Sequence, residues 1–484
     1  MARSEARALA IPASRNRSGD ELDWTSIGEE ALALLGAYIR FPTVNDPQSL
    51  GADEAREAPW RSGREAEAAA WLADQLAADG IEAELLESAP GRVNLIARVR
   101  GSGAGRPILL LSHSDVVPAV RGEWSHGIDP FGGEVREGYL YGRGALDLKG
   151  LGIAHLMTLK LLQRTAPALQ RDVVLLIVAD EEAGGRYGAQ WLLEQRPELR
   201  DADLVLGEGA YSPRGLLNYP GPIHAIAAGE KGYLELELTA DQAAHHASMP
   251  AEDNAPARLV RALERVLAME RRLRITPLAS QLLRQLAPAA GGLHRLLMRN
   301  PRWMARLAPG PLSRSAILSS MLQDKLAVTV LAAGQKHNVV PSQARAVLSI
   351  RLLPETDPVD LTARIERAVA DPAIEIRRLM HKPANLSRWN TRAFEILSRH
   401  AAAQPDKPLV VPILSPGASD CRFWRALGVS CYGWIPFVIP GEDLHRVHGP
   451  DERVSLEAFR AGLRSYYEAV HELAATDQEL NDER

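Results

Sequence analysis

The sequence predicts an α/β fold: a mainly parallel central sheet flanked by helices, with a smaller α+β domain inserted into it. Three observations support this prediction. Residues 107–115, 171–182 and 202–209 each run through a mainly apolar stretch into acidic residues or histidine. A helical segment, residues 151–164, separates the first two, and such alternation is typical of a parallel sheet covered on both faces. From about residue 226 the pattern changes to that of a separate α+β domain.

The chain before the first apolar strand can be assigned element by element. Residues 1–27 contain Arg, Ser and Pro without a sustained apolar stretch, and we expect them to form a flexible lead-in. Helical periodicity follows, and Gly80 closes the second helix, because glycine is typical just after a helix C-terminus. The expected elements are helices from Gly28 and over residues 64–79, then strands over residues 81–87 and 93–101.

The inserted domain is predicted over residues 226–354. Residues 231–240 alternate strictly between apolar and polar, as a half-exposed strand does, and a helix over 254–273 follows. Residues 325–334 and 343–353 then predict a pair of strands. The larger domain would therefore comprise residues 28–225 and 355–474, followed by a C-terminal tail over residues 475–484.

Composition excludes several classes of function. The chain has 484 residues, enough for two domains, and its net charge of -5 provides no positive field that would recruit nucleic acid. Two cysteines, Cys421 and Cys431, exclude a disulfide framework and a thiolate zinc site, and they favour a reducing compartment. No secretory signal is visible, and no run reaches the roughly 18 apolar residues of a membrane span. We therefore expect a cytoplasmic protein without nucleic-acid partners or a membrane span.

Polar residues that could carry chemistry follow the apolar strands. His113 and Asp115 are two residues apart and would share one strand face, where a carboxylate fixes the tautomer of a histidine, as it often does at metals. Asp147 precedes an apolar helix, a position where a lone Asp is ordinarily a cap. Three consecutive acids at residues 180–182 would need cations if buried, although an exposed acidic turn would explain them equally.

The number of such residues favours a metal site over these separate structural explanations. Glu208 ends a further apolar strand, and His448 lies near the C-terminus. Two imidazoles and three carboxylates form a set that zinc accepts, and five ligands over-supply one tetrahedral ion. We therefore expect two ions with one bridging carboxylate, and Glu181 left as general base toward a metal-activated water. The expected ligands are His113, Asp147, Glu182, Glu208 and His448.

Eight motifs in this order resemble a known enzyme family. They are LLLSHSDVVP, W....DPF.G....G.LYGRGALDLKG, ADEEAGG, GEG, HASMP, NVVPSQARA, IRLLP and HG..ER. The series resembles the di-zinc aminoacylase and carboxypeptidase family, which includes acetylornithine deacetylase, succinyl-diaminopimelate desuccinylase and glutamate carboxypeptidase. It is most similar to the carboxypeptidase S-like, N-acyl-amino-acid hydrolase branch. The resemblance runs from about Gly28 to about Leu473.

The resemblance implies a zinc-dependent hydrolase that cleaves an amide or peptide bond beside a free carboxylate. It implies two Zn²⁺ per subunit, which Co²⁺ or Mn²⁺ could replace, and a cis peptide bond between Asp147 and Leu148. Asp115 would orient His113, and Glu181 would be the catalytic base. The implied ligands are His113 and Glu208 at one zinc, Glu182 and His448 at the other, and Asp147 as the bridge.

The resemblance also implies substrate-contacting residues in the inserted domain. His246 would polarise the scissile carbonyl, from its own or a partner subunit, and only the alignment on ASMP favours it over His245. Asn338 and Arg351 would hold the substrate, with the Arg351 guanidinium binding the terminal carboxylate bidentately. Two positions depart from the family pattern without removing a ligand: Leu148, where Asp or Asn is frequent, and Ser419, where Thr is usual.

The residues that would determine substrate preference form no motif as distinctive as those of the expected metal site. Residues 271–323 contain nine arginines and no acidic residue. The favoured interpretation is an amphipathic helical elaboration with solvated arginines. The alternatives are an apolar channel for a long acyl group and a surface patch that contacts anionic lipid.

The sequence is compatible with several alternative functions. The substrate could be an N-acyl amino acid or a short peptide, so a dipeptidase or carboxypeptidase is an alternative to an amidase. An inactive relative that only binds carboxylated ligands is disfavoured by the complete ligand set. No GxSxG motif supports a serine nucleophile. The alternating strand at residues 231–240 is expected at the edge of its sheet, and it favours a homodimer formed by sheet extension through the inserted domain.

Overall fold

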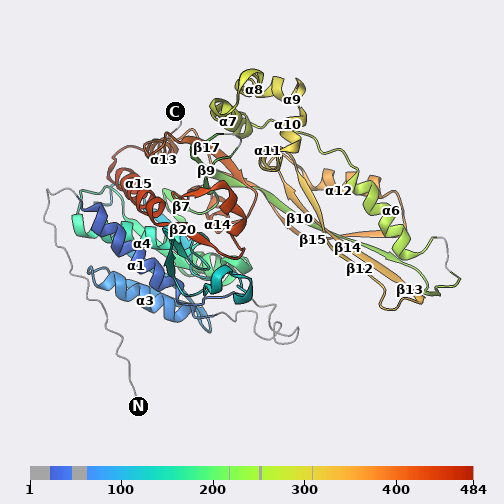
Figure 1. Cartoon of the computed structure of the whole chain (residues 1–484), viewed down its shortest axis with the longest axis horizontal. Helices are drawn as coiled ribbons and strands as arrows, with labels where there is room; N and C mark the ends of the chain where they lie inside the picture. The colour runs from blue at the N-terminus through green and yellow to red at the C-terminus, as the bar shows by residue number, and fades with distance from the viewer. Residues whose placement is uncertain (1–21, 46–62, 217–218, 250–252, 308, 483–484) are drawn as a thin grey trace, which may run out of the picture. The chain divides into compact units, whose positions relative to one another are not determined.

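The computed structural model describes residues 22–45, 63–216, 219–249, 253–307 and 309–482 (Figure 1). The chain forms two compact units. The first unit comprises residues 1–226, 388–410 and 419–484, and the second comprises residues 227–387 and 411–418.

A mainly parallel sheet forms the centre of the first unit. Strands β6, β3, β7 and β18 are parallel to one another, whereas β1 and β2 continue the sheet in antiparallel pairing. Every residue of β3, β6 and β7 is buried, which explains their continuous apolar runs. The order in this unit is β1 (Ala83–Ala89), β2 (Arg92–Val99), β6 (Val173–Val178), β3 (Ile108–His113), β7 (Leu204–Gly207) and β18 (Ser430–Gly433). Three further strands, whose residues belong wholly or in part to the second unit, pair with one another: β9 (Ile223–Glu230) pairs with β16 (Asn385–Leu386) and with β17 (Leu409–Ser415).

Helices cover both faces of this sheet, as the sequence predicts. Helix α4 packs on β3 and β6, with α1 and α15 beside it (Figure 1). On the other face, α5 and α14 bury Leu192 and Trp424 against alternate residues of β3 and β6. The helices are α1 (Trp24–Ile39), α3 (Glu65–Ala77), α4 (Lys149–Thr165), α5 (Trp191–Gln195), α13 (Arg392–Ala402), α14 (Cys421–Arg425) and α15 (Leu456–Ala475).

The two ends of the described chain are more ordered than expected. Helix α1 begins at Trp24, within the predicted lead-in, because the Asp23 carboxylate accepts hydrogen bonds from the backbone N–H groups of residues 25 and 26. Residues 1–21 of that lead-in lie outside the described residues. In the predicted C-terminal tail, Leu480 is fully buried and Asn481 donates to the Asp203 carboxylate.

The second unit contains an antiparallel sheet covered by helices α6 (Ala255–Leu267) and α12 (Pro358–Val369). Its strands lie in the order β12 (Lys325–Ala333), β14 (Gln343–Leu352), β10 (Gly232–Asp241) and β15 (Ile374–Lys382). The unit therefore extends to residue 387, beyond the predicted boundary at residue 354. The physical reason is non-local: β15 pairs with β10, and α12 packs against α6.

Residues 271–323 are largely helical, in agreement with the predicted elaboration. The helices are α7 (Pro277–Leu286), α8 (Gly292–Arg299), α9 (Pro301–Leu307), α10 (Pro309–Arg314) and α11 (Ala316–Leu322). Short strands complete the chain: β4 (Glu134–Arg136), β5 (Tyr139–Tyr141) and β20 (Arg453–Ser455), β8 (Ser212–Arg214) with β19 (Val438–Pro440), and β11 (His245–His246) with β13 (Val339–Val340). Among the described helices, none has the length and apolar character needed to cross a membrane.

Candidate metal centre

The parallel strands bring the predicted ligands to one edge of the sheet. His113 is the last residue of β3, Glu182 follows β6 in a short turn, and Glu208 directly follows β7. Because β6, β3 and β7 are parallel neighbours, their carboxyl ends meet, which is where ligands gather in open α/β sheets.

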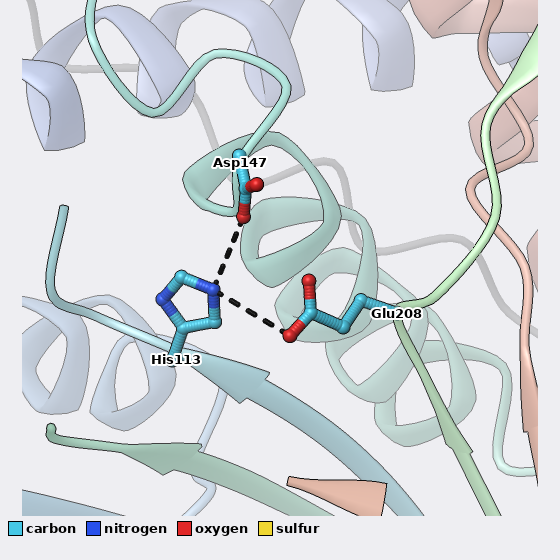
Figure 2. A group of neighbouring side chains, drawn as sticks. All are labelled: His113, Asp147 and Glu208. Carbon is cyan, nitrogen blue, oxygen red and sulfur yellow. Dashed lines mark hydrogen bonds and ion pairs between the residues drawn. The ribbon is translucent and has the colours of Figure 1, made fainter. Parts of the chain in front are cut away.

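The first group of candidate ligands consists of His113, Asp147 and Glu208 (Figure 2). His113 Nε2 lies 3.2 Å from Asp147 Oδ1 and 3.8 Å from Glu208 Oε1. Figure 2 shows both carboxylates pointing at this ring nitrogen. Ligands at 2.0–2.2 Å from a tetrahedral zinc lie about 3.3 Å from one another, so the observed separations suit a shared cation.

The second group consists of Asp147, Glu182 and His448. His448 Nε2 lies 3.2 Å from Asp147 Oδ2 and 3.3 Å from Glu182 Oε1. Asp147 therefore presents one carboxylate oxygen to each group, which is the arrangement expected of a bridging ligand. Tyr211 also donates a hydrogen bond to Asp147 Oδ2, at 3.1 Å.

Glu452 organises the backbone that carries Asp147. Its buried carboxylate accepts hydrogen bonds from the N–H groups of Gly144, Leu146 and Asp147, at 3.0, 2.7 and 3.0 Å. Arg143 Nη1 lies 2.7 Å from the same carboxylate, and its Nη2 donates to the carbonyl of His448. The peptide bond between Asp147 and Leu148 is cis, as the resemblance implies.

Asp115 has a wider role than the sequence indicates. His113 Nδ1 lies 2.9 Å from the Asp115 carbonyl oxygen and 3.5 Å from its carboxylate, which leaves Nε2 directed at the ligand group. The Asp115 carboxylate accepts hydrogen bonds from the backbone N–H groups of Glu181 and Glu182, at 3.1 and 3.0 Å, and from Asn45 Nδ2 at 2.7 Å. Asp115 therefore fixes the turn that carries both glutamates.

Glu181 has two charged neighbours, Arg422 and Asp420, that the sequence motifs did not identify as site residues. Arg422 Nη1 lies 3.6 Å from Glu181 Oε1, and Arg422 Nη2 lies 3.5 Å from Asp420 Oδ1. Burial, together with the negative charge of Asp420, raises the pKa of Glu181 well above its usual value. Burial likewise raises the pKa of Asp420, to about 7. The signal that could have identified both residues is the short polar segment SDCR at residues 419–422.

Electrostatics at the site favour a bound cation. Burial and the neighbouring carboxylates of Glu181 and Asp147 raise the pKa of Glu208 well above its usual value. Hydrogen bonds to Asp147 and Glu182 raise the pKa of His448 to about 10. Glu182 Oε1 is buried, and His448 Nε2 lies 3.3 Å from it. These features fit divalent metal ions, because positive charge would relieve the repulsion among the buried carboxylates.

The other predicted substrate-binding residues lie in the second unit. His246 is exposed on β11, where its Nδ1 lies 2.7 Å from Ser248 Oγ. The backbone carbonyl oxygen of Asn338 accepts a hydrogen bond from the backbone N–H of Ala247. This bond holds the segment that contains His246 against the segment that contains Asn338. The Arg351 guanidinium lies over the Tyr233 ring, 4.3 Å from its centroid. Their roles in substrate binding stay predictions.

Comparison with known proteins identifies the family. Residues 109–472 match the sequence profile of peptidase family M20/M25/M40, which is well over half of the chain. The chain belongs to this family. Within it, the chain is 29% identical to N-fatty-acyl-amino acid synthase/hydrolase PM20D1 of Homo sapiens over 388 residues, 77% of this chain and 75% of that protein. It is 26% identical to aminoacylase-1 of Pongo abelii over 93% of this chain and 98% of that one.

The fold agrees with solved M20 structures. The M20 metallo-carboxypeptidase Sso-CP2 of Sulfolobus solfataricus superposes with a TM-score of 0.67 at 21% identity, over 91% of this chain and 98% of that chain. Because the chain belongs to peptidase family M20/M25/M40, it is an enzyme that hydrolyses amide bonds. Its described residues contain candidate ligand groups for a dinuclear metal centre, which is typical of the family.

Proposed function

We propose that this protein is a di-zinc amidase that hydrolyses N-acyl amino acids at the amide bond beside the free carboxylate. The observation that carries the proposal is the pair of ligand groups that share Asp147. The names of the relatives support the substrate class, since both an N-fatty-acyl-amino acid synthase/hydrolase and an aminoacylase match most of the chain.

The two groups of side chains support the proposed metal ligands. His113 and Glu208 would hold one ion, Glu182 and His448 the other, and Asp147 both. When bound, two zinc ions supply Lewis acidity that polarises the scissile carbonyl and makes water more acidic. Imidazole nitrogen and carboxylate oxygen suit zinc, and Co²⁺ or Mn²⁺ are compatible with the same set.

Glu181 is the proposed proton carrier. It is buried beside the proposed ligand Glu182 on the turn held by Asp115, and burial raises the pKa of its carboxyl above the usual value, which makes the carboxylate a stronger base. Its carboxylate accepts the proton of the attacking water and returns that proton to the leaving amine. Arg422, 3.6 Å away, would keep the carboxylate in place between these two transfers.

In the second unit, His246, Asn338 and Arg351 are proposed substrate contacts. His246 would stabilise the developing oxyanion, and Arg351 would pair with the free carboxylate of the substrate. We also propose a cytoplasmic homodimer that assembles through the second unit. Residues 231–240, which were expected to form an edge strand, form β10 and pair with β14 on one side and β15 on the other, so sheet extension would have to use the edge strand β12 instead. The two buried cysteines form no disulfide, which supports a reducing compartment.

A substrate panel with metal control tests the proposal. N-acyl amino acids of varied chain length and a set of dipeptides are offered before chelation, after it, and with zinc restored. We expect hydrolysis of N-acyl amino acids that is lost on chelation and recovered with zinc. Cleavage of dipeptides alone would replace the proposal with a dipeptidase. Activity that survives complete metal removal would refute a metal mechanism.

Two adjacent glutamates give a matched pair of variants. Glu181→Gln is expected to lower kcat by about 100- to 10,000-fold, the range for a lost general base, with metal content unchanged. Glu182→Gln is expected to lower metal content, measured by elemental analysis after dialysis, because it removes a ligand. Normal turnover in Glu181→Gln would exclude Glu181 as the base.

A further inference from the structure

Helices α8 and α9 expose large apolar side chains to solvent. Leu293 and Leu296 on α8 are 67% and 58% exposed, and Trp303 and Leu307 on α9 are 59% and 65% exposed. Such residues are ordinarily buried, and a contiguous exposed group of them usually marks a contact surface. We call these four residues the apolar pairs of α8 and α9.

These exposed residues are additional to the ones that hold the helices in place. Met298 of α8 and Met304 of α9 are 6% and 3% exposed, and α7, α8 and α9 pack against one another. α7 contributes Leu282 and Leu286 to the buried residues of this helical segment. Each short helix therefore has one apolar side buried by its neighbours and a second apolar side exposed.

Exposed arginines accompany each apolar pair. On α8 they are Arg295 and Arg299, and on α9 Arg302 and Arg306, four residues apart in both cases and hence on one side of the helix. None of the four guanidinium groups has an ion pair with another described residue. The surrounding segment, residues 271–323, contains no acidic residue that could neutralise these arginines.

We propose that α8 and α9 dock on an anionic lipid surface. The pattern has the two components that interfacial helices need: tryptophan and leucine that enter the acyl boundary, and arginines that pair with headgroup phosphates. An acidic protein would satisfy the arginines, but it would leave the exposed leucines without an apolar layer. RNA would leave the same leucines uncovered. The inference goes beyond the proposed hydrolase function and does not depend on it.

Co-sedimentation of the full chain with vesicles tests the proposal. The vesicles contain phosphatidylcholine alone or phosphatidylcholine with phosphatidylglycerol, at low and high salt. We expect binding to the anionic vesicles that weakens at high salt. Each basic residue near an anionic surface contributes about fivefold to partitioning, so Arg302→Gln/Arg306→Gln should weaken binding by roughly 30-fold. Trp303→Ser/Leu307→Ser should weaken binding to a comparable extent.

Matched controls separate a local site from general effects. Val260→Ser/Leu267→Ser removes two exposed apolar groups from α6, and Arg367→Gln/Arg378→Gln removes two exposed charges from the same unit. Both controls should bind vesicles as the wild type does. A wild type that stays in the supernatant with anionic vesicles would overturn the proposal, as would equal losses in the controls. A change in oligomeric state in Trp303→Ser/Leu307→Ser, measured by light scattering, would instead show that a second copy covers this surface.

Discussion

At the scale of single residues, Glu452 organises the loop that carries the proposed bridging ligand. Its carboxylate accepts three backbone N–H groups and faces Arg143, so glutamine in its place would turn an amide NH₂ toward those donors. Glu452→Gln is expected to lower zinc affinity by roughly 10- to 100-fold, as loss of a residue that supports metal ligands typically does. Competition with a chromogenic chelator measures this affinity.

The control for Glu452→Gln is a buried carboxylate with a purely structural environment. Asp203 is 2% exposed and pairs with Arg171 and Arg106. Asp203→Asn is expected to lower the free energy of unfolding by about 3 kcal/mol, because it leaves a buried guanidinium without its partner, while zinc affinity is retained. If both variants lose zinc affinity equally, Glu452 acts through general stability.

The sequence was sufficient to predict candidate ligands that lie at the ends of apolar strands. His113 and Glu208 stand out because apolar runs end in them. Glu452 and Asn45 were not predicted, because they act through hydrogen bonds to groups that are distant in sequence. Glu452, for example, is 305 residues from Asp147, whose backbone N–H it accepts. A local pattern does not encode such partners. For the same reason, the role of Asp115 in holding the turn of Glu181 was missed.

At the scale of elements, the contact between β7 and β18 determines where Glu208 stands. Gly433 of β18 pairs with Gly207 of β7, and a Cβ at Gly433 would lie 1.9 Å from the Glu208 carbonyl oxygen. Gly433→Ala must therefore displace the strand end that carries a proposed ligand. We expect a loss of about 1–3 kcal/mol in unfolding free energy, typical of overpacking, together with reduced zinc content.

Gly122→Ala is the matched control for this glycine, because a Cβ there meets no atom within 4 Å. Its stability and zinc content should equal those of the wild type. A Gly433→Ala variant that also retains both would show that β7 and β18 can separate without moving Glu208.

Local sequence patterns were sufficient to recognise strands but not to assign every element to its unit. The apolar strands of the first unit were recognisable because a buried parallel strand is apolar throughout. The end of the second unit was misplaced because α12 and β15 resemble any helix and strand of an α/β protein. The pairing of β15 with β10, whose partners Ala240 and Ile374 are far apart in sequence, and the packing of α12 on α6 assign these two elements to the second unit.

At the scale of the whole molecule, the proposed ligands are confined to one unit. All five lie in the first unit, whereas β10 and β14 lie in the second, which has its own buried core. A ligand that binds only the folded state stabilises it by RT ln(1 + [L]/Kd), about 2.7 kcal/mol at 100 times Kd. Zinc should therefore stabilise the first unit selectively.

Hydrogen exchange measured by mass spectrometry checks this selectivity. Removing zinc is expected to raise exchange up to about 100-fold in peptides around residues 113, 147, 182, 208 and 448, since 2.7 kcal/mol corresponds to that factor. Peptides from β10 and β14 should exchange at the same rate with and without zinc. If β10 and β14 respond as strongly as the ligand peptides, the two units unfold as one, and zinc is then a stabiliser of the entire chain.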